Sequence, residues 1–219
     1  MLRSVDNPLA VFDAKLRGAI APPLARAGHR LASAGVTPDA VTAAAWGIGI
    51  GACVAAAFRL WPVALVLWLG NRALDGLDGP VARSIGPTDR GGFLDVVADF
   101  SVYGGFVVGV AIAVPDARLA CGVLLFTFYV SGTALLTLSS LLERRRQNDG
   151  DERSVRLTGG LAEGFETIVV FVLFCILPGS AAVIAWVFAA AVAITAAQRV
   201  MNGVRLLRAD NILSGRGTE

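Results

Sequence analysis

Four aspartates stand close together in a stretch of the chain that is otherwise apolar. They are Asp75, Asp78, Asp95 and Asp99. Asp75 and Asp78 are three residues apart, and Asp95 and Asp99 are four apart, so each pair lies on one face if its segment is helical. Gly91 extends the second face by one more turn. Two facing helices would therefore bring four carboxylates to one place.

Leaving four carboxylates uncompensated in a membrane would be costly. Insertion scales put an aspartate at the centre of a membrane helix at roughly +2.5 to +3.5 kcal/mol, so four would cost about 10 to 14 kcal/mol. Divalent metal ions would offset this cost, and all-oxygen ligation favours Mg²⁺ or Mn²⁺ over Zn²⁺. Four carboxylates suit two ions about 4 Å apart, an arrangement that catalyses displacement at phosphorus. The spacing alone also allows an ion-conducting or structural polar cluster within a helix bundle.

The order of these residues resembles the signature of the CDP-alcohol phosphotransferase family, also called CDP-alcohol phosphatidyltransferases. That signature reads D-x-x-D-G-x-x-A-R, then a short gap, then G-x-x-x-D-x-x-x-D. The 25 residues from Asp75 to Asp99 fill every position, with Asp75, Asp78, Gly79, Ala82 and Arg83, a gap of seven residues, and then Gly91, Asp95 and Asp99. The looser resemblance outside this stretch covers GVTPDAVT (Gly35 to Thr42), the chain length and the hydropathy layout.

The resemblance implies an enzyme that transfers a substituted phosphate from a CDP-alcohol, such as CDP-diacylglycerol, to the hydroxyl of a second alcohol. CMP is released, and the reaction belongs to phospholipid biosynthesis. Two Mg²⁺ or Mn²⁺ ions would be bridged by Asp75 and Asp95, with Asp78 completing one metal site and Asp99 the other. Asp99 would also take the proton of the acceptor hydroxyl. The resemblance further implies a homodimer, and no nucleic-acid partner is expected.

The resemblance also implies a CDP pocket within the signature. Gly79 has no side chain and permits close approach of the nucleotide, and Ala82 leaves room on the same face. Arg83 can neutralise diphosphate charge and donate several hydrogen bonds. Gly91 completes the implied pocket, and Thr88, three residues before it, occupies the place of a nucleotide-binding Ser or Thr in the family.

A helix start precedes the first apolar segment. Thr37 suits a helix N-cap, with Pro38 at the first helical position and Asp39 in the first turn. Capping alone would explain these residue types. The resemblance implies in addition that Asp39 and Thr42 contact the CDP group.

The acceptor is not identified by the sequence. Glu163 and Glu166 are three residues apart at the start of an apolar segment, where acidic residues compensate the helix dipole. They form a candidate acceptor site for a polyol or a cationic alcohol. Arg144 to Arg146 favour either an anionic membrane surface or a phosphorylated acceptor.

The composition predicts an all-α integral membrane protein. Of the 219 residues, 55% are apolar and only 16% are charged, and the mean hydropathy is +0.67. We expect a single membrane domain over 1–219, with an amphipathic interfacial segment at 1–34, a six-helix bundle at 35–208 and a tail at 209–219. The six apolar spans are 40–58, 60–82, 92–114, 118–141, 162–178 and 180–204.

The basic residues predict the orientation in the membrane. Six spans place both termini and two of the connections on one side, which then holds 16 of the 19 basic residues, whereas the opposite side holds Arg59 and Arg118. The positive-inside rule therefore puts the termini and the aspartates on the cytoplasmic side of an inner membrane.

Two alternatives remain open at this stage. One is a transporter or channel with an acidic cation site, although such proteins usually show repeated halves or broken helices, and neither is evident in this sequence. The other is a member of the same family that uses a water-soluble CDP-alcohol.

Overall fold

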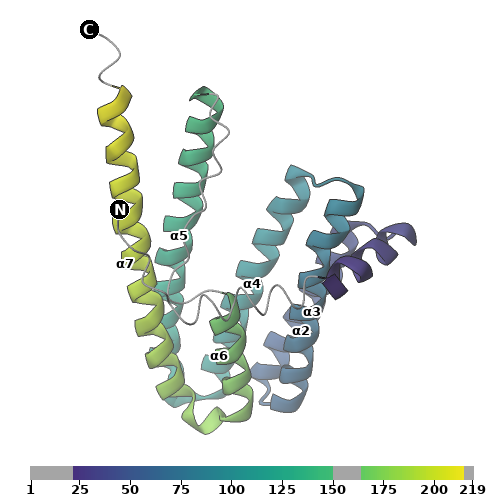
Figure 1. Ribbon diagram of the computed structural model, residues 1–219. Helices are drawn as coiled ribbons and strands as arrows, with labels where there is room; N and C mark the ends of the chain where they lie inside the picture. The colour runs from purple at the N-terminus through teal and green to yellow at the C-terminus, as the bar shows by residue number, and fades with distance from the viewer. Residues whose placement is uncertain (1–21, 150–163, 215–219) are drawn as a thin grey trace. The chain divides into compact units, whose positions relative to one another are not determined.

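The computed structural model describes residues 22–149 and 164–214, which are helical apart from short connections (Figure 1). Residues 22–33 form a helix, of which the predicted continuation toward residue 1 lies outside the described residues. The following helices are α2 (Pro38–Ala57), α3 (Trp61–Ile85), α4 (Asp89–Ala113), α5 (Arg118–Asp149), α6 (Gly164–Ile176) and α7 (Ala181–Ser214), with the short 3₁₀ turns η1 (Pro115–Ala117) and η2 (Pro178–Ser180). The described residues contain no strand, so the predicted all-α class is confirmed for them.

The helices group into two compact units, Met1–Gly109 and Val110–Glu219. In the first unit, α2 and α3 pack along each other (Figure 1). In the second unit, α5 and α7 form the main pair, and α6 packs on α7. The aspartates and their surroundings belong to the first unit. The expectation of a single domain with these boundaries stays a prediction.

The predicted start of α2 is confirmed. The Thr37 side chain accepts a hydrogen bond from the backbone N–H of Ala40 at 3.3 Å, Pro38 occupies the first turn, and Asp39 lies there too. The hydroxyl removes one unsatisfied donor from the helix end, and the proline lacks an N–H that would need a partner there. This well-defined start fixes the position of Asp39 and Thr42 on α2.

Glycines on α4 lie against α2 in a close helix contact. A Cβ atom added at Gly109 would lie 2.5 Å from the carbonyl oxygen of Cys53, and one at Gly105 would lie 3.1 Å from the Cys53 sulfur. On α2, a Cβ added at Gly49 would similarly lie 2.6 Å from a methyl carbon of Val102 on α4. Side chains at these positions would force the helices apart, so the glycines set the separation of α2 from the helix that carries Asp95 and Asp99.

The helix at 22–33 packs on α3 beside the aspartates. A Cβ at Gly28 would lie 2.5 Å from the Cβ of Pro80, and Leu24 lies against Gly76. Pro80 is inside α3, where its ring removes one backbone donor. Gly28 is buried, which shows that this helix covers part of α3. Whether it also lies in a membrane interface stays a prediction.

The prediction of six membrane spans is not confirmed. Within residues 22–149 and 164–214, four helical stretches are long and apolar enough to cross a membrane: Pro38–Ala57, Asp89–Ala113, Pro115–Arg144 and Pro178–Arg208. The α3 helix has 25 residues, but Arg72, Asp75 and Asp78 lower its apolar character. The described part of α6 is apolar and has 13 residues, too few to span the hydrocarbon core alone.

Candidate active site

Three of the four aspartates meet in the first unit. Asp75 and Asp78 come from α3 and Asp95 from α4, and each offers a carboxylate oxygen within 4.8 Å of the others. The chain reverses between these helices over a connection that includes Gly86, whose φ of +119° is a conformation that residues with side chains rarely adopt. Three hard oxygen donors this close, all partly exposed, fit a divalent cation such as Mg²⁺ or Mn²⁺.

Asp99 lies one helical turn beyond Asp95 and does not join this group. Its Oδ1 accepts a hydrogen bond from Nη2 of Arg72 at 2.9 Å. Arg72 also reaches Asp75, through Nη1 and Oδ2 at 3.2 Å. The two carboxylates are each 28% exposed, whereas the Arg72 side chain is only 9% exposed. An arginine at this place could pair with a carboxylate or with a substrate phosphate, and in the structure Arg72 pairs with the carboxylates.

The Arg72 guanidinium directs all five of its N–H groups to acceptors in the protein. Besides the two aspartates, Nη1 donates to the Tyr103 hydroxyl at 2.8 Å, and Nε and Nη2 donate to Oδ1 of Asn71 at 2.8 and 2.6 Å. Asn71 is anchored in turn, because its Nδ2 donates to the carbonyl oxygen of Ala45 on α2 at 2.8 Å. A guanidinium has five donors, so none is left for a ligand.

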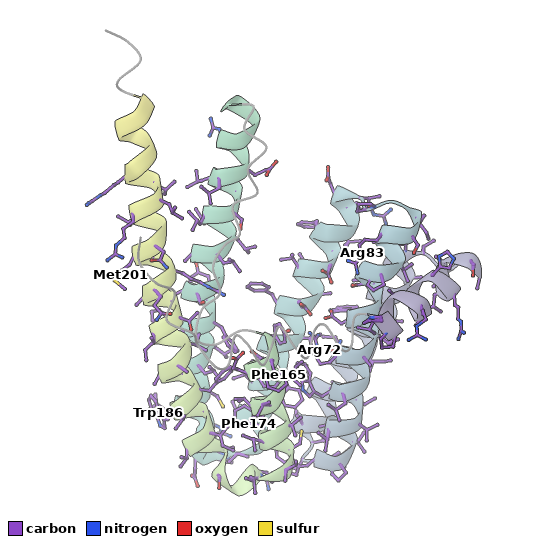
Figure 2. The ribbon with its side chains drawn as sticks, in the orientation of Figure 1. Arg72, Arg83, Phe165, Phe174, Trp186 and Met201 are labelled. Carbon is purple, nitrogen blue, oxygen red and sulfur yellow. The ribbon has the colours of Figure 1, made fainter. Side chains whose placement is uncertain are left out.

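Two aromatic rings flank the same guanidinium. Its central carbon lies 4.8 Å from the ring centroid of Trp68 and 4.9 Å from that of Tyr103, distances at which a cation is attracted to a ring. Trp68 is fully buried and also packs against Phe106. Figure 2 shows Arg72 on α3, with Arg83 further along the same helix. Arg72 is therefore held on its faces as well as along its edges.

A pocket of about 350 Å³ opens beside the carboxylates. It is lined by Asp78 and Asp95 and by six of the seven residues that the sequence predicts to bind substrate: Asp39, Thr42, Gly79, Ala82, Thr88 and Gly91. The seventh, Arg83, is not among the lining residues, but its Nη1 is close to Gly79, 3.3 Å from where a Cβ of that residue would lie. The structure thus brings these residues together; their contact with a nucleotide stays a prediction.

Hydrogen bonds tie the pocket wall to the aspartates and to the start of α4. The Thr42 hydroxyl lies within hydrogen-bonding distance of Oδ2 of Asp78 at 3.3 Å and of the Pro38 carbonyl oxygen at 3.1 Å. Thr88 accepts a hydrogen bond from the Gly91 N–H at 3.0 Å, which is an N-terminal capping contact. A side chain at Gly91 would crowd both Thr88 and Asp39, at 3.1 and 3.4 Å. The bare backbone of Gly91 therefore leaves the pocket open.

The candidate acceptor residues are only partly described. Glu163 lies outside the described residues. Glu166 lies in the first turn of α6, in the second unit, and is partly exposed. Its predicted role as an acceptor-binding residue stays a prediction.

Sequence reasoning missed two side chains of the site, Asn71 and Tyr103. A signal for Tyr103 was present, because it continues the i, i+4 series of Gly91, Asp95 and Asp99 by one more turn. Asn71 gave no comparable signal, since its contacts with Ala45 and Arg72 depend on how α2 and α3 pack.

The fold is shared with a solved lipid-synthesising enzyme. A crystal structure of phosphatidylinositol phosphate synthase (PgsA1) from Mycobacterium tuberculosis, with CDP-DAG bound, superposes with a TM-score of 0.67 at 21% identity, covering 82% of this chain and 92% of that one. The same enzyme in complex with manganese and citrate gives a TM-score of 0.62 at 23% identity, covering 83% and 87%. The chain therefore has the helical fold of phosphatidylinositol phosphate synthase.

A closer relationship appears at the level of sequence. No protein-family model matches the chain. The chain is 39% identical over 201 residues to the inner membrane protein YnjF of Escherichia coli (strain K12), covering 90% of this chain and 98% of YnjF. It belongs to the family of that protein. Together with the four apolar helices, this relationship makes the chain a multi-pass membrane protein.

Proposed function

We propose that this protein is a CDP-alcohol phosphotransferase of phospholipid biosynthesis, which transfers a substituted phosphate from a CDP-alcohol to the hydroxyl of an acceptor alcohol and releases CMP. One observation carries the proposal: three carboxylates within 4.8 Å of one another border a pocket lined by the residues of the family signature. The shared fold supports it, because the solved neighbours bind CDP-DAG in one case and manganese in another.

The carboxylates of Asp75, Asp78 and Asp95 would hold divalent cations, with Asp99 as the fourth ligand through Oδ2, the oxygen that Arg72 does not contact. Such ions supply charge stabilisation at the phosphorus and at the leaving CMP. They are Mg²⁺ or Mn²⁺ because all donors are carboxylate oxygens, and two ions are proposed because the signature provides four aspartates.

The protein's own side chains position the reactants. The pocket beside Asp78 and Asp95 takes the cytidine and diphosphate groups, with Gly79 and Gly91 allowing close approach and Arg83 balancing diphosphate charge. The acceptor oxygen attacks the phosphorus that carries the donor alcohol. The bond from that phosphorus to the CMP oxygen breaks, CMP leaves with the electron pair, and the proton of the acceptor goes to Asp99.

A lipid donor such as CDP-diacylglycerol suits a site on helices that cross a membrane, since its acyl chains can stay in the bilayer while the head group enters the pocket. We place the site and both termini on the cytoplasmic side of the inner membrane, on the strength of the distribution of basic residues. A homodimer is proposed from the family resemblance alone, as is a contribution of Glu163 and Glu166 to the acceptor site.

The test is CMP release by the purified protein in detergent micelles. It uses CDP-diacylglycerol as the donor, a panel of phosphorylated and unphosphorylated alcohols as acceptors, and Mg²⁺, Mn²⁺ or a chelator. We expect release only with both a divalent cation and an acceptor, and its loss in Asp78→Asn. The matched control is Asp116→Asn, an exposed aspartate in η1.

The same assay separates the alternatives. Release of CMP from CDP-glycerol but not from CDP-diacylglycerol would identify a water-soluble donor. Undiminished release in the chelator would refute the metal-dependent mechanism. The absence of release with every donor and acceptor, together with divalent cation flux into liposomes that contain the protein, would favour a transporter or channel.

A further inference from the structure

An arginine close to a pocket for an anionic substrate would be expected to bind the anion, but the contacts of Arg72 differ from that expectation. It is the side chain that contacts both Asp75 and Asp99, yet it is absent from the residues that line the 350 Å³ pocket. Because its five N–H groups are already directed to Asn71, Tyr103 and the two aspartates, it has none to offer a diphosphate. Its role must therefore be exerted through the carboxylates.

We propose that Arg72 is a positioning residue of the phosphotransfer site. Its guanidinium fixes the orientation of the Asp99 carboxylate beside the Asp75–Asp78–Asp95 group, so that Asp99 can receive the acceptor's proton. This inference rests on the proposed function, because a proton acceptor is needed only if an alcohol is activated.

The contacts of the Arg72 guanidinium hold it in one orientation. Nη1 and Nη2 contact different carboxylates at 3.2 and 2.9 Å, so a single planar group fixes the separation of Asp75 and Asp99. The plane itself is fixed by Oδ1 of buried Asn71 on one edge and by the rings of Trp68 and Tyr103. A lysine at this position would keep the positive charge, but it lacks the planar fork of two nitrogens, Nη1 and Nη2, that contacts both carboxylates.

The positive charge of Arg72 also opposes cation binding. It occupies one oxygen of Asp75 and one of Asp99, and it lies in direct contact with a member of the three-carboxylate group. Removing the charge would leave the carboxylates more negative and would release Asp99 from its fixed orientation. The protein would then bind a divalent cation more tightly while its proton acceptor is misplaced. General damage to the fold would instead weaken cation binding and turnover together.

The experiment compares Arg72→Gln and Arg72→Lys with the wild-type protein and with Arg118→Gln, a charge-matched control at the exposed start of α5. Mn²⁺ affinity is measured on substrate-free protein from the electron paramagnetic resonance signal of free Mn²⁺. The kcat and KM for CDP-diacylglycerol are measured from CMP release, and the thermal midpoint of each variant is recorded without cation.

For Arg72→Gln we expect Mn²⁺ to bind at least ~10-fold more tightly, because a neighbouring positive charge is lost. We expect kcat to fall roughly 100-fold with KM within about threefold, because the donor pocket is untouched and only the proton acceptor is misplaced. Arg72→Lys should keep the Mn²⁺ affinity within about threefold and should lose kcat as Arg72→Gln does, because the charge remains and the fork is gone.

Two results would overturn the proposal: weaker Mn²⁺ binding in Arg72→Gln, or normal kcat in either Arg72 variant. If Arg72→Gln does not fold, Tyr103→Phe replaces it. That variant removes one acceptor of Nη1, and it should lower kcat about 3- to 10-fold at unchanged Mn²⁺ affinity; an unchanged kcat would contradict the positioning role. A wild-type protein that releases no CMP would refute the proposed function. The Mn²⁺ measurements would still show whether Arg72 opposes cation binding at the carboxylates.

Discussion

Gly49 offers a test of how the packing of α2 supports the site. A methyl group added there would lie 2.6 and 2.9 Å from the two methyl carbons of Val102 on α4, and 2.9 Å from Nδ2 of Asn71 on α3. Both neighbours are buried, and Asn71 Nδ2 is engaged with the Ala45 carbonyl oxygen at 2.8 Å. Gly49→Ala therefore adds a methyl group where α2, α3 and α4 meet, next to Asn71, which contacts Arg72.

The magnitude follows from these distances. Carbon atoms pack at about 3.5 to 4.0 Å, so Val102 must retreat by about 1 Å. Overpacking of this kind costs about 1 to 3 kcal/mol, and alanine gains roughly 0.5 to 1 kcal/mol over glycine in a helix. Gly47, two residues earlier in α2, has nothing within 4 Å of an added Cβ. Gly47→Ala shares the helix gain without the clash, so the two variants should differ in unfolding free energy by about 1 to 3 kcal/mol.

The assay is reversible unfolding of both variants in mixed detergent micelles, followed by the loss of helical circular dichroism. Because Asn71 provides the acceptor for Nε and Nη2 of Arg72, Gly49→Ala should also slow CMP release, whereas Gly47→Ala should not. Equal stability of the two variants, or a more stable Gly49→Ala, would refute the packing of α2 against Val102 and Asn71.

Two further substitutions test individual side chains of the site. Asp99→Asn should abolish transfer while the protein still binds CDP-diacylglycerol, because the amide cannot take the acceptor's proton; normal CMP release would show that Asp99 is not the base. Thr42→Val removes a hydroxyl 3.3 Å from Asp78. Since the Pro38 carbonyl oxygen competes for the same proton, we expect the lower end of the range for a charged hydrogen bond, about 1.5 kcal/mol or a tenfold loss of Mn²⁺ affinity. An unchanged Mn²⁺ titration would mean that the hydroxyl donates only to Pro38.

The arrangement of the pocket could be predicted from the sequence because it depends mostly on local geometry. Helical spacing puts Asp75 and Asp78 on one face, and the short turn containing Gly86 brings Asp95 back toward them. The cap at Thr37 places the start of α2 at the same pocket. Periodicity and turn formation depend on residues that are close together in the sequence, so they can be predicted without knowledge of the tertiary packing.

The separation of Asp99 from the other three carboxylates could not be predicted in that way. Spacing alone placed all four acids together, but Arg72 lies within reach of Asp99 only because α3 and α4 pack at a particular distance. Asn71 and Tyr103 then fix which way the guanidinium points. An arginine beside several acids has many low-energy pairings, and the choice among them is made by residues far away in the sequence.

The predicted span at 60–82, which corresponds to α3, is not confirmed, and the reason is again the charged residues of the site. Hydropathy counts Arg72, Asp75 and Asp78 as charges against membrane insertion, although Arg72 is 9% exposed and paired with Asp75. These charged residues of the site are the reason that α3 is not among the four helices apolar enough to cross a membrane. A scale that treats each residue alone cannot register that opposite charges compensate one another within the helix.

If the proposed function is correct, the charges around the pocket would favour two divalent cations over one. Arg72 compensates one of the four carboxylates, so three negative charges remain when all are ionised. With a single divalent ion the site would still be negative and would repel the diphosphate of a CDP-alcohol. A second ion would reverse the sign, and Arg83, which lies close to Gly79 of the pocket lining, would add one further positive charge. In the proposed mechanism the two arginines would therefore have different roles: Arg72 would orient the acids, and Arg83 would balance the charge of the substrate.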